Sequence, residues 1–123
     1  MIPELQGKFG GMAFRVPTPT VSVIDFTCVL SKGASIEEIN GAMQEYAGDK
    51  MKGVLQYTEE PLVSSDLKRN EHSSIFSAMD TLMIDPTFCK VVSWYDNEWG
   101  YSCRLADITA YVGARLASAA GVR

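Results

Sequence analysis

Alternating apolar positions predict two long strands. Residues 21–30 place Val21, Val23 and Val29 on one face of an extended chain and Ile24, Phe26, Cys28 and Leu30 on the other. Since both faces are apolar, we expect other parts of the molecule to cover both sides of this strand. Residues 88–95 also alternate, with Phe88, Val92 and Trp94 on one face and Cys89, Val91 and Tyr95 on the other.

Other stretches carry weaker strand patterns. Residues 12–16 alternate until Pro17-Thr18-Pro19, where proline interrupts the backbone hydrogen bonds of a strand. Residues 53–58 predict a short strand. The polar stretch 64–74 predicts a loop, followed by short apolar pieces at 75–76 and 82–84.

Two segments have the period of amphipathic helices. Ser35 and Glu38 match a capping box, in which each side chain bonds the other residue's backbone amide. Apolar residues then recur at helical spacing until Gly48, at Ile36, Ile39, Met43, Tyr46 and Ala47. A second helix follows the turn at 96–98 and runs to about residue 117, with an apolar face of Tyr101, Leu105, Ile108, Val112 and Leu116.

These elements predict an α+β fold: a mixed, largely antiparallel sheet with helices on one face, plus a C-terminal helix. At 123 residues and 46% apolar composition, the chain is large enough for one domain with its own core. A formal net charge of -4 argues against binding to nucleic acid or anionic lipid. No apolar run approaches a membrane span, and we expect a cytoplasmic location.

The three cysteines show no metal-site or disulfide spacing. Cys28, Cys89 and Cys103 lie far apart, without a paired Cys or His motif, so we predict no metal site. Each is interpreted as a small buried apolar residue.

The turn from Ser93 to Tyr101 concentrates aromatic, amide and acidic side chains where a strand runs into a helix. One interpretation is structural: Asp96 or Asn97 caps the helix. The other is a ligand site, in which Asn97 bonds a carboxamide and Tyr101 offers a ring face or hydroxyl. Because Asp96 and Glu98 are acidic, an uncharged or cationic ring suits this helix start better than an anion.

Arg15 is the second candidate for a ligand-binding residue. It precedes the rigid Pro17-Thr18-Pro19 segment and could bind phosphate or carboxylate through a bidentate contact. The alternative is an internal ion pair with a carboxylate such as Asp25. Arg104 is interpreted as a structural ion-pair partner, and His72 as a loop residue that makes hydrogen bonds, because the surrounding serines lack the motif of a hydrolase.

Four ordered motifs resemble glyceraldehyde-3-phosphate dehydrogenase across essentially the whole chain: MAFRVPTP at 12–19, VSSD at 63–66, HSSIF at 72–76 and SWYDNEWGYS at 93–102. The resemblance implies an NAD-dependent enzyme of glycolysis that oxidises an aldehyde through a cysteine thioester and passes the acyl group to inorganic phosphate. It implies that Arg15 binds the anion of substrate or phosphate, that Asn97 holds the nicotinamide carboxamide, and that Tyr101 flanks the ring.

The resemblance also implies a homotetramer, with the sheet face of Val21, Val23 and Val29 toward a neighbouring subunit and the last helix docked on the nucleotide-binding domain. Residues 1–123 correspond to part of the C-terminal catalytic domain. The glycine-rich nucleotide-binding motif and the Ser-Cys-Thr-Thr-Asn nucleophile motif do not occur in them. We therefore expect a fragment or internal start, with no catalytic residue of its own, that is inactive by itself.

The function predicted is part of a phosphorylating dehydrogenase that converts glyceraldehyde 3-phosphate, phosphate and NAD to 1,3-bisphosphoglycerate. Two alternatives remain open at this point. One is erythrose-4-phosphate dehydrogenase, which shares the architecture, and the other is a non-catalytic, self-associating interaction module.

Overall fold

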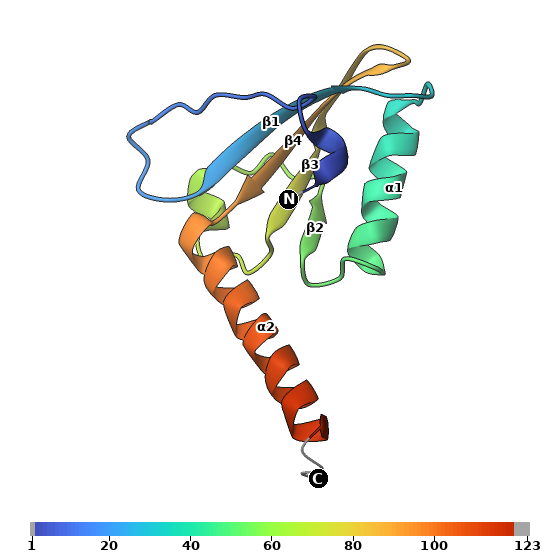
Figure 1. The fold of residues 1–123 in the computed structure, drawn as a ribbon. Helices are drawn as coiled ribbons and strands as arrows, with labels where there is room; N and C mark the ends of the chain where they lie inside the picture. The colour runs from blue at the N-terminus through green and yellow to red at the C-terminus, as the bar shows by residue number, and fades with distance from the viewer. Residues whose placement is uncertain (1, 120–123) are drawn as a thin grey trace.

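The computed structural model describes residues 2–119, and it confirms the predicted α+β fold. Four strands form one sheet in the order β1-β4-β3-β2, with antiparallel pairing except between β2 and β3, which run parallel. Helix α1 covers one face of the sheet, and α2 leaves the sheet at the end of β4 (Figure 1). The strands are β1 (Ser22–Val29), β2 (Leu55–Thr58), β3 (Ser74–Asp85) and β4 (Phe88–Tyr95), and the helices are α1 (Ile36–Gly48) and α2 (Asn97–Ala119).

Helix α1 begins and ends as its sequence predicts. The Ser35 hydroxyl accepts a hydrogen bond from the Glu38 amide at 3.2 Å, and the Glu38 carboxylate accepts one from the Ser35 amide at 2.8 Å. These two bonds satisfy amides that have no partner within the helix. The apolar face of α1 then packs on the sheet.

The core consists of two clusters on opposite faces of the sheet, because neighbouring residues of a strand point to opposite sides. Ile75 packs with Val21 and Leu67 on one face, next to Trp94. Phe76 packs on the other face with Leu55 and Ala78, beneath Ile39, Met43 and Ala47 of α1. Ile75 and Phe76 are the largest fully buried side chains of the described chain, so the middle of β3 anchors both clusters.

The structure corrects the prediction for β3, which is one strand of 12 residues where the sequence predicted a loop end and two short apolar pieces. Its pairing with β4 is irregular between Ser77 and Leu82. Asn40 of α1 bridges this irregularity, since its amide nitrogen donates to the Ala78 carbonyl at 3.1 Å and its oxygen accepts from the Thr81 hydroxyl at 2.7 Å. A side chain from α1 thus satisfies polar groups of the bulge.

Two predictions about the first third of the chain are wrong. Residues 12–16 form no strand, and Met12 and Phe14 are each 79% exposed in an extended segment that loops out beside β1 (Figure 1). Nor are both faces of β1 covered within the described chain: Val23 and Ile24 are each 49% exposed. Phe26 is partly covered, because Phe9 stacks against it with ring centroids 6.3 Å apart.

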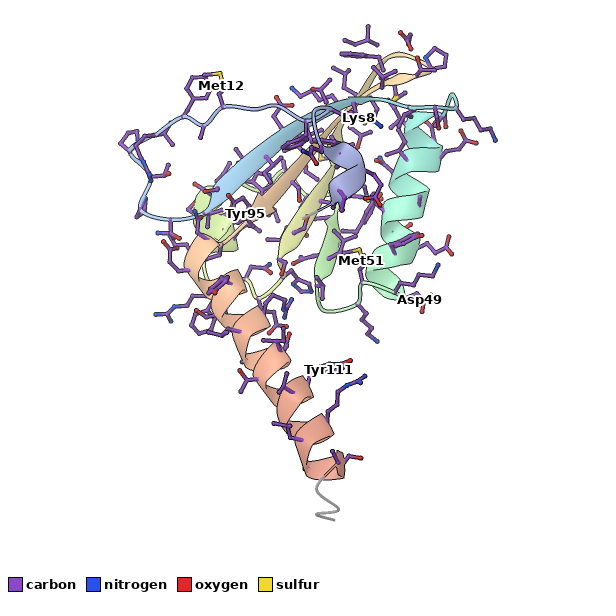
Figure 2. All side chains as sticks on the ribbon, in the orientation of Figure 1. Lys8, Met12, Asp49, Met51, Tyr95 and Tyr111 are labelled. Atoms are coloured by element: carbon purple, nitrogen blue, oxygen red, sulfur yellow. The ribbon has the colours of Figure 1, made fainter. Side chains whose placement is uncertain are left out.

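The apolar face of α2 is exposed along its length. Figure 2 shows Tyr111 projecting from the part of α2 that lies away from the sheet. Side chains of this helix are 47% to 70% exposed at Tyr101, Leu105, Ile108, Tyr111, Val112 and Leu116. No helix among residues 2–119 is long and apolar enough to cross a membrane.

Candidate functional site

The turn between β4 and α2 is organised by the carboxylate of Asp96. One of its oxygens, Oδ1, accepts hydrogen bonds from the amides of Glu98 at 3.2 Å and Trp99 at 2.9 Å, which caps α2. The other, Oδ2, accepts from the Arg69 amide at 2.9 Å. Asp96 is 4% exposed, so one buried carboxylate joins the helix start to the loop before β3.

Asp96 is ionised at neutral pH. Its burial favours the neutral acid, but the hydrogen bonds from the Trp99, Arg69 and Glu98 amides favour the carboxylate and hold its pKa below the ordinary value of 3.8. The helix start therefore carries a fixed negative charge. Such a charge repels anions and attracts a cationic ring.

Asn97, the first residue of α2, lies against the beginning of β1. Its Oδ1 accepts a hydrogen bond from the Ser22 hydroxyl at 3.0 Å. A carbonyl oxygen has a second lone pair and the amide nitrogen has two hydrogens, so Asn97 can still accept from and donate to a ligand. Tyr101, one turn further along α2, is 70% exposed and available to a neighbouring group.

The segment that carries Arg15 is tied to the same turn. Five residues after Arg15, the Thr20 hydroxyl donates to the Glu98 carboxylate at 2.8 Å, and Ser22 then bonds Asn97. Arg15 itself is exposed. The residues that follow Arg15 thus contact the turn through Thr20 and Ser22, two contacts that the sequence did not reveal.

The predicted alternative for Arg15, an ion pair with Asp25, is wrong. Asp25 pairs with Lys90 at 2.9 Å, and Arg15 has no ion pair among residues 2–119. The interpretation of Arg104 is confirmed: it pairs with Asp107 at 2.8 Å and donates to the Gly53 carbonyl at 2.9 Å.

Two residues beside this turn adopt the left-handed backbone conformation that favours glycine. Val21 has a φ of 72° and Arg69 a φ of 62°. For a β-branched valine this conformation is strained, and such strain is held only where the surroundings fix it. Val21 is 6% exposed in the core and directly precedes Ser22, while the Arg69 amide bonds Asp96.

Close packing holds the start of α2 against the preceding loop. A Cβ atom added at Gly100 would lie 3.1 Å from the His72 carbonyl oxygen, so this position suits a residue without a side chain. His72 lies in a loop and makes hydrogen bonds there, as predicted. Its amide and its Nδ1 both lie within hydrogen-bond distance of the Asn70 Oδ1, at 3.0 and 2.9 Å.

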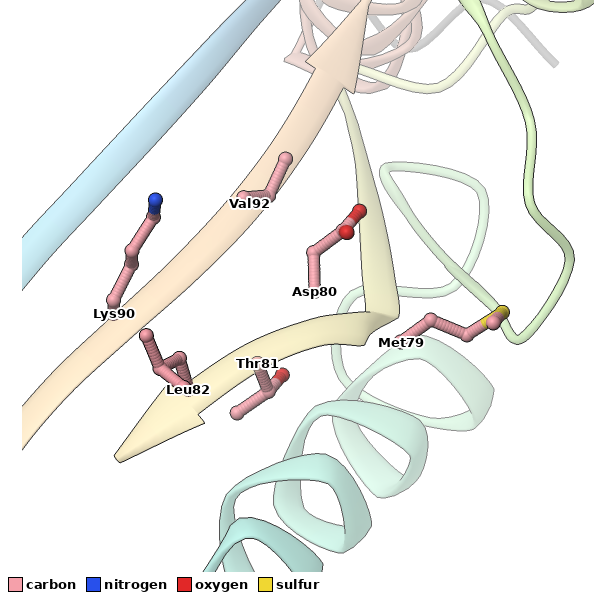
Figure 3. A pocket seen from close by; sticks show the side chains of 6 residues that line it. All are labelled: Met79, Asp80, Thr81, Leu82, Lys90 and Val92. Carbon is pink, nitrogen blue, oxygen red and sulfur yellow. The ribbon is translucent and has the colours of Figure 1, made fainter. Parts of the chain in front are cut away.

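One hollow of the surface lies away from these residues. Figure 3 shows it beside the irregular part of β3, with a volume of about 250 Å³ and a lining of Met79, Asp80, Thr81, Leu82, Lys90 and Val92. None of Arg15, Asn97 and Tyr101 lines it. No group of His, Cys, Asp and Glu residues in the described chain is arranged to hold a metal ion.

The fold and the turn together define an α+β domain with a polar turn where a strand runs into a helix. Residues 1–97 match the family described as glyceraldehyde 3-phosphate dehydrogenase, C-terminal domain, and this chain belongs to that family.

Curated relatives agree with this assignment. The chain is 57% identical over 114 residues to glyceraldehyde-3-phosphate dehydrogenase B of Aspergillus oryzae, covering 93% of this chain and 34% of the relative. It is 54% identical over 118 residues to glyceraldehyde-3-phosphate dehydrogenase of Podospora anserina, covering 96% and 35%. It is also 54% identical over 116 residues to the Mycolicibacterium smegmatis enzyme of that name, covering 94% and 34%. The chain therefore spans about a third of the length of the curated relatives it matches.

Proposed function

We propose that this chain serves as part of an NAD-dependent, phosphorylating glyceraldehyde-3-phosphate dehydrogenase of glycolysis. The observation that carries the proposal is the position of Asn97, which lies at a helix start with a buried anionic cap and is held by Ser22. The family match and the named relatives favour this activity over erythrose-4-phosphate dehydrogenase and over a non-catalytic interaction module. A cytoplasmic location follows from the proposed role in glycolysis.

In this proposal, Asn97 and Tyr101 hold the nicotinamide end of NAD. The amide of Asn97 pairs with the carboxamide, which presents a matching donor and acceptor. The ionised Asp96 favours a positively charged ring next to the helix start. Tyr101 contributes an aromatic face or hydroxyl at the side of the ring. NAD, when bound, supplies the hydride acceptor of the reaction.

Arg15 binds the anion of the phosphorylated aldehyde or the attacking inorganic phosphate. A guanidinium presents a fork of N–H donors that fits two phosphate oxygens at once. Separate positions suit the two ligands, because the acidic start of α2 repels the anion that Arg15 attracts.

The test is a chimera in which this chain replaces the matching part of the Aspergillus oryzae relative. We expect it to reduce NAD when given glyceraldehyde 3-phosphate and inorganic phosphate, and to prefer this sugar over erythrose 4-phosphate. A chimera that folds and assembles as the parent does, yet reduces no NAD with either sugar, would rule the proposal out.

Replacing Asn97 with alanine in the chimera is expected to raise KM for NAD roughly tenfold, because one or two hydrogen bonds of about 1 kcal/mol each are lost. KM for phosphate should change little. Ser22→Ala is the matched control: it removes the bond that orients Asn97 and leaves the amide in place, so its effect on KM for NAD should be smaller. An equal rise in KM for NAD and for phosphate after Asn97→Ala would contradict the assigned role.

We further propose that the chain assembles with copies of itself through the uncovered side of β1. Val23 and Val29 on this side are 49% and 73% exposed, whereas Val21, expected to share the contact, is buried in the core. Sedimentation velocity of the isolated chain should show associated species, and Val23→Lys with Val29→Lys should shift them toward monomer. Gln44→Lys, at an exposed position of α1, should leave the distribution unchanged. A wild-type monomer would refute the association.

A further inference from the structure

Cys28 and Cys89 lie directly opposite each other in the antiparallel pair of β1 and β4. Side chains at opposed positions of such a pair point to the same face of the sheet. Their spacing along the chain does not predict this pairing, because the two cysteines lie in the first and the last strand of the sheet. Cys103, the third cysteine, lies in α2 and outside this pair.

The spacing of the two backbones suits a disulfide bond. The Leu30 amide donates to the Thr87 carbonyl at 2.7 Å, just beyond the last paired residues of the two strands. Pairs of the hydrogen-bonded type recur every second residue, so Cys28 and Cys89 form such a pair, with Cα atoms about 5.5 Å apart. This value lies close to the commonest Cα separation of disulfide-bonded cysteines.

The position of β1 allows the small adjustment that bond formation requires. Opposed Cβ atoms in this kind of pair lie roughly 1.5 Å farther apart than those of a disulfide. β1 is an edge strand that pairs with β4 alone, and several of its side chains are exposed on both faces. Its local twist against β4 can therefore change without displacing a second neighbouring strand.

We propose that Cys28 and Cys89 form a reversible cross-strand disulfide that fastens the edge strand β1 to β4, with a small-molecule disulfide such as oxidised glutathione as the oxidant. The more accessible Cys28 reacts first: its thiolate attacks the small disulfide, forms a mixed disulfide and releases one small thiol. Cys89 then loses its proton and attacks the Cys28 sulfur, which releases the second small thiol. Two protein thiols are oxidised and one disulfide is reduced.

The two thiols differ in a way that suits these successive roles. Cys28 is partly exposed, whereas Cys89 is 3% exposed. Burial raises the pKa of the Cys89 thiol, and the adjacent Cys28 adds to the rise. Cys89 thus stays protonated until Cys28 has formed the mixed disulfide. Its thiol then lies next to the Cys28 sulfur that it attacks.

The far end of β1 connects this bond to the turn that carries Asn97. Ser22 opens β1 and bonds Asn97, so fastening β1 to β4 restricts the strand whose first residue orients that amide. The disulfide would hold the edge strand in register and protect it from separating.

The experiment equilibrates the folded 123-residue chain with oxidised and reduced glutathione, then maps peptides by mass spectrometry without reduction. A Cys28–Cys89 cross-linked peptide within single chains is expected, together with a rise in Tm of roughly 10 °C that reducing agent reverses. Cys103→Ser is the matched control and should keep both the cross-link and the rise in Tm. Cys28→Ser, a change at a partly exposed site, should abolish both.

Three results would overturn the proposal. One is that both thiols stay free under oxidising glutathione. Another is that Cys28 stops at the glutathione adduct. The last is a bond between chains, visible as a dimer on a non-reducing gel.

Discussion

Replacing Asp96 with alanine is expected to lower the free energy of unfolding by about 2–4 kcal/mol. The substitution removes the acceptor for three backbone amides, those of Glu98, Trp99 and Arg69, in a site that is nearly closed to water. Each unpaired amide keeps its desolvation cost, and Arg69 loses the contact that helps to hold its left-handed backbone. Urea unfolding followed by circular dichroism measures the change.

The control is Asp49→Ala, which removes an exposed carboxylate at the end of α1 and should change stability by less than about 0.5 kcal/mol. Equal losses in the two variants would show that the Asp96 contacts contribute nothing beyond an ordinary surface charge.

The stability supplied by Asp96 should also depend on pH. Its pKa is lower in the folded chain than in the unfolded one, so the contribution is fully present above the unfolded value and disappears as pH falls through the folded value. Hydrogen bonds from Thr87 and Phe88 likewise lower the pKa of Asp85. Because Asp85 titrates in both proteins, the difference between wild type and Asp96→Asn isolates Asp96, and that difference should shrink below about pH 4.

Local signals explain which elements could be predicted from the sequence. The capping box of α1 and the alternation of β4 depend only on residues a few positions apart, and both elements appear with the expected ends. The α2 start was predictable for the same reason, since Asp96 bonds amides two and three residues along the chain.

Non-local contacts explain the failures. The β3 pattern is interrupted by Asp80 and Thr81, and the strand continues because Asn40, from a distant helix, bonds the bulge. Residues 12–16 alternate like a strand, but within the described chain no neighbour pairs with their backbone. Alternation predicts which side chains could share a face, whereas a strand also needs a partner.

The candidate site likewise combines residues that local sequence signals predict with contacts that they do not predict. Asn97 was predicted in the turn before a helix and Tyr101 on that helix, and the structure places both on the first turns of α2. The contacts that join the start of β1 to this turn, from Thr20 to Glu98 and from Ser22 to Asn97, span more than 70 residues. Neither periodicity nor capping rules could reveal those pairs, nor the strained backbone of Val21 between them.

Replacing Arg15 with alanine is expected to lower kcat/KM for inorganic phosphate roughly 100-fold in the chimera, with KM for NAD changed by less than about twofold. The reason is the loss of two charge-assisted hydrogen bonds to one anion, which together contribute about 3 kcal/mol. Arg15→Lys should give an intermediate loss, because lysine keeps the charge but lacks the fork of donors. Initial rates measured against each ligand in turn separate the two effects.

Arg115→Ala provides the matched control. This arginine is exposed on α2, where its guanidinium lies 4.3 Å from the centre of the Tyr111 ring, and its removal deletes the same charge at a distance from the Arg15 segment. If Arg115→Ala weakened phosphate use as much as Arg15→Ala, general attraction between the protein and the anion would explain the loss. If Arg15→Ala instead raised KM for NAD and for phosphate equally, the division of the site into an anion-binding arginine and a nicotinamide-binding turn would be wrong. Asp96 carries a negative charge next to Asn97, so the anion and the nicotinamide should bind at separate places. Arg15→Ala should therefore weaken phosphate use alone, whereas Asn97→Ala should weaken NAD use alone.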